Sequence, residues 1–216
     1  MPRRTEGPCG GKRSATLAIS IVVALTTLTA APAGQAGPLV ASADGCTNAP
    51  LEQPFVRWLD VSPYVLVADG GFENGASGWS LSGAGVVDGN EPYHVHGADE
   101  SKSLSFSSGG SATSATTCVG LEEPTLRLFM RSSDASPLSM LKVEVLFEDA
   151  LGTVRATPIG VVPALASTSW NPFLPMTIGA NLLPLIDGKT PVRFRFTAEG
   201  SADWQIDDVY VDPRYH

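Results

Sequence analysis

The two histidines of "HVH" have a spacing that could support metal chemistry. If this segment is a strand, His94 and His96 project from the same face, because side chains alternate between the two faces. Imidazole and carboxylate groups bind zinc and copper, and the acids Glu91, Asp99 and Glu100 lie nearby in the sequence. The spacing fixes no third ligand, however, so the favoured interpretation is a pair of solvent-facing or hydrogen-bonded histidines.

Other catalytic patterns find little support in the chain. The sequence contains no G-x-S-x-G motif for a serine nucleophile. The adjacent acids Glu122-Glu123 and Asp207-Asp208 would point to opposite faces of a strand, whereas glycosidases need two acids that face one sugar. No Lys-Ser/Thr pair follows "DGGFENG", which argues against a phosphate-binding loop. We therefore expect a protein that is not an enzyme, with a metal-assisted hydrolase at "HVH" as a minor alternative.

Carbohydrate binding requires aromatic platforms for the apolar faces of sugar rings, with polar groups beside them. Trp79 and Trp204 lie in strand patterns and are expected in the core, while Trp58 and Trp170 remain unassigned. Phe129 is the only aromatic residue on the polar face of the strongest predicted strands, which weakens the case for a flat glycan platform. The candidate ligand-binding residues on loops and on that polar face are Tyr93, His94, His96, Arg127, Phe129 and Arg131.

Short β-strands must position these side chains. Apolar and polar residues alternate with period two in "TLRLFMR" (125–131), "LKVEVLFED" (141–149) and "PVRFRFTA" (191–198). Turn sequences such as "DGN", "SSGG" and "IDGK" separate about ten such runs, and no helical period is sustained after the N-terminal region. The pattern predicts an all-β domain, namely a two-sheet antiparallel β-sandwich of jelly-roll type.

The last predicted strand contains an interruption. In "DWQIDDVYVD", Trp204 and Ile206 follow one phase of the alternation, and Val209 and Val211 follow the other. A β-bulge at Asp207-Asp208 produces this shift, and bulges turn side chains toward neighbouring sites. The sequence therefore predicts a bulge at the two aspartates.

The N-terminal region has the features of a secretory signal peptide. Basic residues at positions 3, 4, 12 and 13 precede the apolar run "ATLAISIVVALTTLTAAPA", which ends in a small-residue cleavage pattern. The alternative is an uncleaved membrane anchor, since the run is nearly long enough to span a bilayer. We expect a signal peptide over 1–36, an extended Pro/Ala/Gly-rich arm over 37–55, and a β-sandwich over 56–216 in a secreted, extracellular protein.

The charge balance limits the classes of partner. The chain has 14 Lys+Arg and 22 Asp+Glu, a formal net charge of −8. Removal of the predicted signal peptide takes away four basic residues and one acid, leaving a net charge of −11. Such a domain repels phosphate backbones and anionic lipid, which argues against nucleic acid and membrane surfaces as partners. Extracellular glycans, cations and surface proteins remain.

Two cysteines follow the predicted signal peptide. Cys46 lies in the arm and Cys118 in a predicted strand, and an even pair in an oxidising compartment is most simply a disulfide. Lipidation of Cys46 is the less favoured alternative, because the flanking "ASADGC" matches a lipidation motif poorly. The sequence predicts a Cys46–Cys118 disulfide.

Two motifs at the ends of the domain carry a family resemblance. The opening "GGFENG…GW" and the closing "WQIDDVYVD" resemble carbohydrate-binding-module-like domains of the galactose-binding-like jelly-roll group, and also uncharacterised secreted bacterial proteins built on this domain alone. The resemblance runs from about Tyr64 to Pro213, and only the end motifs are specific. It implies a non-catalytic binding module.

The resemblance also implies a metal site. Glu73 matches the acid near the family's first strand, and Asp207 matches the first acid of its last strand; in many members these acids, with backbone carbonyls, hold a buried structural Ca²⁺. The alternative is that Glu73 caps the turn and that the aspartates are solvated at a sheet edge.

The sequence is consistent with two functional hypotheses. The first is a secreted glycan-binding module, with a structural Ca²⁺. The second is a structural or adhesion domain of the cell surface that contacts proteins and takes no small ligand, which the scarcity of exposed aromatic residues on the polar face favours. Fold analogy does not separate the two.

Overall fold

The computed structural model describes residues 39, 49–120, 124–149, 151–179 and 188–212. The chain divides into Met1–Ala33, which lies outside these residues, and Gly34–His216, which contains the fold. The predicted signal peptide and most of the predicted arm also lie outside the described residues. Where the structure describes the chain, it contains no helix long and apolar enough to cross a membrane.

The predicted disulfide is described at one end only. Cys118 is disulfide-bonded in strand β4. The other two cysteines, Cys9 and Cys46, lie outside the described residues, so the pairing with Cys46 stays a prediction.

Antiparallel strands build the domain, as the alternation of apolar and polar residues predicts. Two short 3₁₀ turns accompany them, η1 at Val56–Trp58 and η2 at Ala164–Ala166. The strands are β1 (Val65–Leu66), β2 (Ser80–Asp88), β3 (Lys102–Thr113), β4 (Thr117–Val119), β5 (Thr125–Ser132), β6 (Met140–Glu148), β7 (Val154–Pro163), β8 (Asn171–Pro172), β9 (Met176–Thr177), β10 (Thr190–Glu199) and β11 (Trp204–Asp212).

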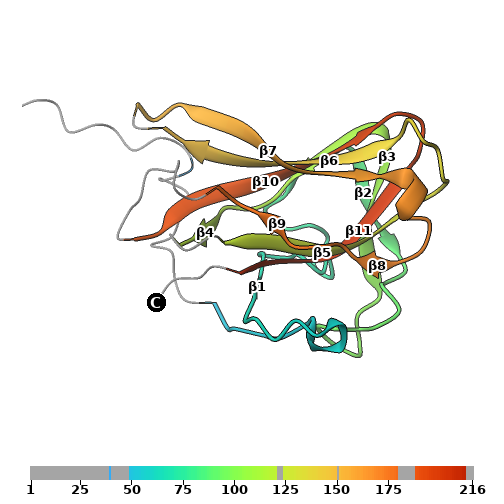
Figure 1. Cartoon of the computed structure of the whole chain (residues 1–216), viewed down its shortest axis with the longest axis horizontal. Coiled ribbons are helices and arrows are strands. Elements are labelled where there is room, and N and C mark those ends of the chain that lie inside the picture. The colour runs from blue at the N-terminus through green and yellow to red at the C-terminus, as the bar shows by residue number, and fades with distance from the viewer. Residues whose placement is uncertain (1–38, 40–48, 121–123, 150, 180–187, 213–216) are drawn as a thin grey trace, which may run out of the picture. The chain divides into compact units, whose positions relative to one another are not determined.

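The strands form one continuous sheet with the order β7-β6-β10-β3-β11-β5-β8. Strand β3 joins the two halves, because its first part pairs with β11 and its last part pairs with β10. The sheet curls over on itself at this strand and gives a sandwich-like fold (Figure 1). The expectation of two separate sheets is corrected here: a strand of 12 residues is long enough to belong to both layers.

The core lies inside the curl, where the predicted apolar faces meet. Leu126, Leu128 and Met130 of β5 are buried there, as the alternation predicts. Burying apolar surface in this way is the main driving force of the fold. The expected core tryptophans are also confirmed, since Trp79 is 9% exposed and Trp204 is 1% exposed.

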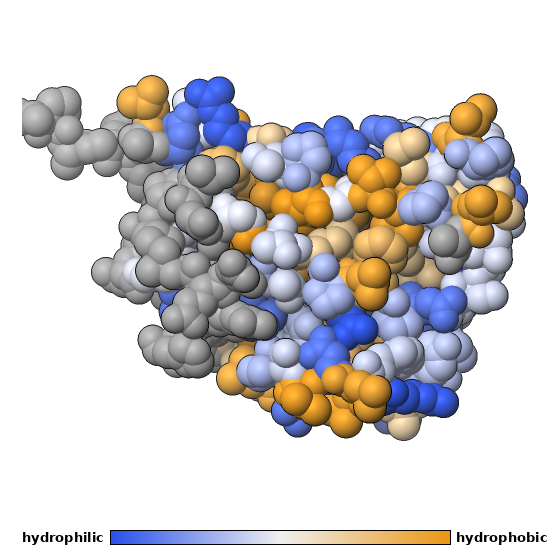
Figure 2. Space-filling view, viewed as in Figure 1, coloured by the Kyte–Doolittle hydropathy of each residue, from blue (hydrophilic) through white to orange (hydrophobic). Residues whose placement is uncertain are grey.

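The two ends of the curled sheet approach each other at β7 and β9. A Cβ atom on Gly160 of β7 would lie 2.2 Å from the sulfur of Met176 in β9, so a side chain at this position has no room. Figure 2 shows hydrophobic residues on the surface around β7 and β9, with hydrophilic residues below them. The edges of the sheet therefore meet at β7 and β9. Part of the apolar surface around these two strands stays exposed.

A second apolar cluster covers the outer face of β5 and β11. It consists of Phe55, Tyr64, Phe129 and Tyr210, and the N-terminal segment 52–64 supplies the first two. A backbone bridge between Glu52 and Tyr64 closes this segment into a loop. Phe129 is fully buried in this cluster. The sequence placed Phe129 on an exposed polar face, but segment 52–64 covers that face.

Arg127 is buried under the same segment. Its guanidinium group forms an ion pair with Asp60, donates from Nε to the carbonyl of Phe173 at 3.0 Å and lies 4.1 Å from the ring centre of Phe55. The arginine therefore fixes segment 52–64 to the sheet. Like Phe129, it is not exposed for contact with a ligand, which corrects its expected place on an open face.

We expect Arg127→Met to lower the free energy of unfolding by about 3 kcal/mol, because the partly buried Asp60 loses its partner. The matched change Arg131→Met, on the same strand face but exposed, is expected to stay within about 0.5 kcal/mol. Urea denaturation of both variants checks this. Equal losses would show that the ion pair with Asp60 does not hold the segment.

Candidate functional site

Four buried acids lie together where β11 meets the segment between β2 and β3. We call Glu91, Glu100, Asp207 and Asp208 the acidic cluster. Each is less than 9% exposed, and three of them are completely buried. Segment 89–101 supplies the two glutamates, and β11 supplies the two aspartates. Buried carboxylates are costly unless hydrogen bonds, protons or cations compensate the charge, so this cluster requires an explanation.

The predicted bulge creates the cluster. The pairing of β11 with β5 shifts between Asp207 and Tyr210, and Asp208 adopts a φ of 49°. Val209 exchanges backbone hydrogen bonds with the 67–70 turn at this point, donating to Gly70 and accepting from Val67. The bulge thereby buries both adjacent carboxylates, instead of leaving one on each face of a regular strand.

The hydrogen bonds inside the cluster are unevenly distributed. Asp207 accepts from the backbone N–H groups of Glu91 (3.0 Å) and Asp208 (2.9 Å). Glu100 accepts from Gly97 through Oε2 at 3.0 Å. Its Oε1 and both carboxylate oxygens of Asp208 are buried with no hydrogen-bond partner among the described residues. Three buried acceptor oxygens of Glu100 and Asp208 therefore lack a donor among the described residues.

Three of the four acids lie close enough together to hold a metal ion. One ligand atom each from Glu91, Glu100 and Asp208 lies within 4.8 Å of the others. The Cα of Gly71 lies beside them, since a Cβ there would approach Glu100 Oε1 at 3.0 Å and Asp208 Oδ1 at 3.3 Å. A side chain at position 71 would therefore crowd these two oxygens. The triad could hold a metal, and its all-oxygen donor set suits a hard divalent cation.

Burial strongly favours the protonated forms of the two aspartates in the absence of a cation. Burial, and then the neighbouring charge of Asp207, raises the pKa of Asp208 to about 10. Burial also raises the pKa of Asp207 to about 8, although its hydrogen bonds from Glu91 and Asp208 act in the opposite direction. A bound cation would favour the ionised forms instead.

Glu73, which the family resemblance pairs with Asp207, has a different set of contacts. Its exposed carboxylate accepts from the backbone N–H groups of Ser101 and Lys102, both at 2.7 Å. Asp69, not Glu73, caps the glycine turn, since it accepts from the backbone of Asn74 at 3.0 Å. Glu73 thus ties the turn to the start of β3, while Asp207 belongs to the acidic cluster. The metal-ligand role of both residues stays a prediction.

The two histidines of "HVH" lie in a loop and have separate partners. His94 is exposed, adopts a φ of 49° and contacts the amide of Asn90 at 3.4 Å. His96 contacts Glu52 at 3.1 Å and the hydroxyl of Tyr210 at 3.3 Å. Glu91 and Glu100, proposed as additional ligands for these histidines, instead belong to the acidic cluster.

Partly exposed aromatic rings form a continuous surface next to the acidic cluster. We call Trp58, Tyr93, Trp170 and Arg131 the aromatic surface. The rings of Trp58 and Tyr93 are in edge contact at 4.9 Å, and the Tyr93 hydroxyl donates to the carbonyl of Trp170 at 3.4 Å. The Arg131 guanidinium lies 5.2 Å from the ring centre of Trp170. Phe129 supports this surface from below through contacts with Trp58 and Tyr93.

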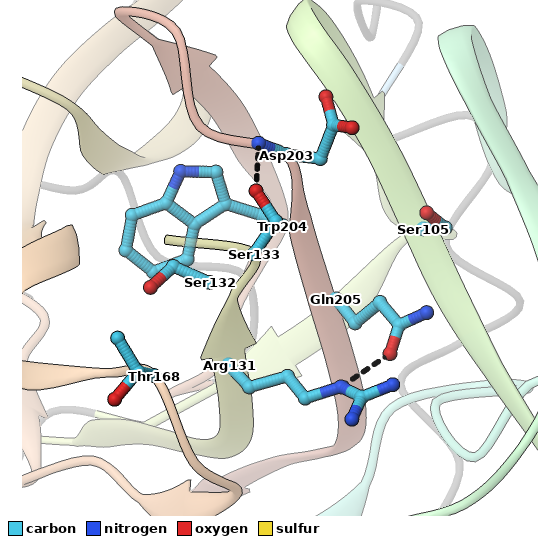
Figure 3. Close-up of a pocket in the computed structure, with 8 residues that line it drawn as sticks. All are labelled: Ser105, Arg131, Ser132, Ser133, Thr168, Asp203, Trp204 and Gln205. Carbon is cyan, nitrogen blue, oxygen red and sulfur yellow. Dashed lines mark hydrogen bonds between the residues drawn. The ribbon is translucent and has the colours of Figure 1, made fainter. Parts of the chain in front are cut away.

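A polar pocket continues from Arg131 along the same face of the sheet. Its volume is about 400 Å³. Arg131 and Gln205 extend side by side from β5 and β11, joined by a hydrogen bond from Nε to Oε1 at 2.6 Å (Figure 3). Among the described residues, no carboxylate forms an ion pair with Arg131. The pocket is lined by Ser105, Arg131, Ser132, Ser133, Thr168, Asp203, Trp204 and Gln205.

Sequence patterns alone do not group these residues. Trp58 and Trp170 lie outside the alternating strands, so their exposure follows from how the loops pack. Of the ligand-binding candidates, Tyr93 and Arg131 belong to the aromatic surface, whereas His94 and His96 lie elsewhere on segment 89–101. The pocket residues Arg131 and Gln205 come together because they pair directly across β5 and β11, which is a feature of the sheet register.

Comparisons with known proteins identify structural neighbours but no close relative. No protein-family profile and no curated protein matches the chain. Solved structures that match include a family 16 carbohydrate-binding module, at 17% identity and TM-score 0.40, covering 68% of this chain and 98% of that one. The adhesin domain K3 of Lys-gingipain from Porphyromonas gingivalis matches at 16% and 0.41, with coverages of 68% and 98%.

A third structure contains a catalytic module. It is the CBM22-1–GH10 part of xylanase 10B from Clostridium thermocellum, complexed with xylohexaose, at 15% identity and TM-score 0.46. The alignment covers 68% of this chain but only 28% of that structure. Carbohydrate-binding β-sandwich domains are thus among the structural neighbours of the chain, at low identity.

The raised pKa values predict a pH dependence in the presence of a chelator. Asp207 and Asp208 bind more protons in the folded than in the unfolded chain, so stability falls as the pH rises from about 5 to 8. The decrease comes from both groups, because each keeps a proton in the folded chain that it loses in the unfolded chain. Thermal unfolding in EDTA at several pH values checks this, and Asp208→Asn should flatten the profile. A wild-type melting temperature that rises over this window would contradict it.

Proposed function

We propose that the chain is a carbohydrate-binding β-sandwich domain that binds its ligand along the aromatic surface and the adjoining pocket. The observation that carries this proposal is the arrangement of partly exposed Trp170 and Tyr93 beside a pocket of hydroxyl, amide, guanidinium and carboxylate groups. Aromatic rings stack on the apolar faces of sugars, and polar side chains bind their hydroxyl groups. The face combines both kinds of group.

A divalent cation, Ca²⁺ by its donor chemistry, is the second part of the proposal. Glu91, Glu100 and Asp208 would hold it, and its charge would replace the protons that otherwise neutralise the cluster. Two oxygens of Asp208 and one of Glu100 that have no partner among the described residues support this assignment. The cation would stabilise the fold at the bulge of β11.

The binding surface is tested by affinity electrophoresis of the chain on a panel of soluble neutral and acidic polysaccharides. We expect retardation by at least one polysaccharide and an affinity about tenfold lower for Trp170→Ala, the loss of about 1.4 kcal/mol expected for an aromatic contact. Lys142→Ala, which removes a partly buried cation on β6 that pairs with Glu144, serves as the control and should bind normally. Absence of retardation on the whole panel would support the protein-contacting alternative.

The cation is tested by thermal unfolding with Ca²⁺ or EDTA. At 100 times the dissociation constant, binding adds about 2.7 kcal/mol, which corresponds to roughly 5–10 °C for a domain of this size. Asp208→Asn should lose the shift. Glu73→Gln should keep it if the acidic cluster holds the cation, and should lose it if Glu73 is a ligand as the family resemblance implies. A wild-type chain without any shift would remove the cation from the proposal.

A further inference from the structure

Glu91 connects the acidic cluster to the aromatic surface. Its two carboxylate oxygens accept hydrogen bonds from the backbone N–H groups of Tyr93 and, at 2.8 Å, of Val95. Its own N–H group donates to Asp207 at 3.0 Å. The same carboxylate contributes an atom to the group that could hold a cation. One buried side chain therefore takes part in both sites.

The loop that Glu91 organises determines where Tyr93 lies. Residues 90–101 contain no regular strand or helix, so side-chain contacts replace the backbone ladder that fixes a strand. His94 adopts the left-handed φ of 49°, a conformation that persists in a non-glycine residue only where neighbours impose it. The two hydrogen bonds to Glu91 flank this residue. Glu91 is thus the group that holds the loop in its turn.

Tyr93 is in turn the central member of the aromatic surface. Its ring contacts Trp58 at 4.9 Å and Phe129 at 5.7 Å, and Arg57 lies 5.0 Å from its centre. Its hydroxyl reaches the carbonyl of Trp170. A displacement of Tyr93 would separate Trp58 from Trp170 and open the surface in the middle.

The charge of the acidic cluster acts directly on this loop. Two of the four acids belong to segment 89–101, and the other two belong to β11 on the opposite side of the cluster. Without a cation, Glu100 Oε1 on the segment and the Asp208 oxygens on the strand have no hydrogen-bond partner among the described residues, so these oxygens do not hold the two sides together. A cation between the carboxylates would draw the two sides together. Both oxygens of Asp208 are buried without a partner among the described residues, and one of them lies within 4.8 Å of ligand atoms of Glu91 and Glu100.

We propose that Glu91 is a positioning residue which couples a divalent cation at Glu91, Glu100 and Asp208 to the ligand surface centred on Tyr93. Cation binding orders residues 91–97 and completes the aromatic surface, so the cation raises the affinity for the ligand. By thermodynamic reciprocity, the ligand raises the affinity for the cation by the same factor. The effect of the cation on ligand affinity rests on the proposed carbohydrate binding. The ordering of residues 91–97 by the cation does not.

Amide hydrogen exchange of the full chain, with Ca²⁺ or with EDTA, tests whether the cation orders residues 91–97. We expect Ca²⁺ to slow exchange at Tyr93 and Val95 by roughly 5- to 150-fold, the usual range of coupling between sites. The amides of Ser101 and Lys102 are the internal control, because Glu73 and not the acidic cluster holds them. Their exchange should change by a much smaller factor.

Two variants separate the coupling from general stabilisation. Asp208→Asn keeps the hydrogen bonds of Glu91 but removes the negative charge and one oxygen of a cation ligand, so exchange at Tyr93 and Val95 should respond much less to Ca²⁺. Glu73→Gln, an acid outside the cluster, should respond like the wild-type chain. Equal exchange at Tyr93 and Val95 with and without Ca²⁺, in a chain whose melting temperature does respond to Ca²⁺, would overturn the coupling.

Affinity electrophoresis in Ca²⁺ and in EDTA tests whether the cation raises the affinity for the ligand. It also distinguishes a failure of this coupling from a failure of the proposed carbohydrate binding. Retardation that weakens in EDTA for the wild-type chain but not for Asp208→Asn supports the coupling. Equal retardation in both buffers overturns it and leaves carbohydrate binding intact. If exchange at Tyr93 responds to Ca²⁺ but no polysaccharide retards the chain, the ordering of the loop is supported and the proposed carbohydrate function is the part that fails.

Discussion

The burial of four carboxylates beside the bulge of β11 is the constraint on which the proposed binding face depends. An isolated ionised carboxylate in a protein interior costs several kcal/mol, and here two such groups are adjacent in the chain. Backbone N–H groups satisfy Asp207, but they leave Asp208 and part of Glu100 without donors among the described residues. Protonation or a cation must supply the rest. The turns at 67–71 and 89–101 lie next to the carboxylates that this compensation concerns.

The outer face of β5 and β11 serves three purposes along its length. Directly paired residues of antiparallel strands share a face, and here the pairs are Arg127 with Tyr210, Phe129 with Asp207, and Arg131 with Gln205. The first pair is buried under segment 52–64, and the third lines the open pocket. In the second pair, Phe129 supports the aromatic surface and Asp207 belongs to the acidic cluster. The stabilising contacts and the proposed binding surface therefore use successive positions of the same two strands.

The curled sheet explains how such a face can be both rigid and accessible. Strand β3 pairs with β10 in one half and with β11 in the other, so one apolar core supports both layers. The loops that carry Tyr93 and Trp170 rest on Phe129 and on the strands below it. Rings held in this way lose little conformational freedom when a ligand binds, which favours affinity.

The sequence by itself determined the strands, because period-two alternation is a local property: the inward residues of 125–131 and 191–198 are buried as predicted. It also located the bulge at Asp207-Asp208, since a change of phase is visible in a single strand. It marked Glu91, Glu100 and Asp208 separately, the first two as neighbours of the histidines. Only the tertiary structure brought them together, because contacts between residues more than a hundred positions apart depend on sheet order. The same reason applies to Phe129 and Arg127, whose face is covered by a segment that no local pattern places there.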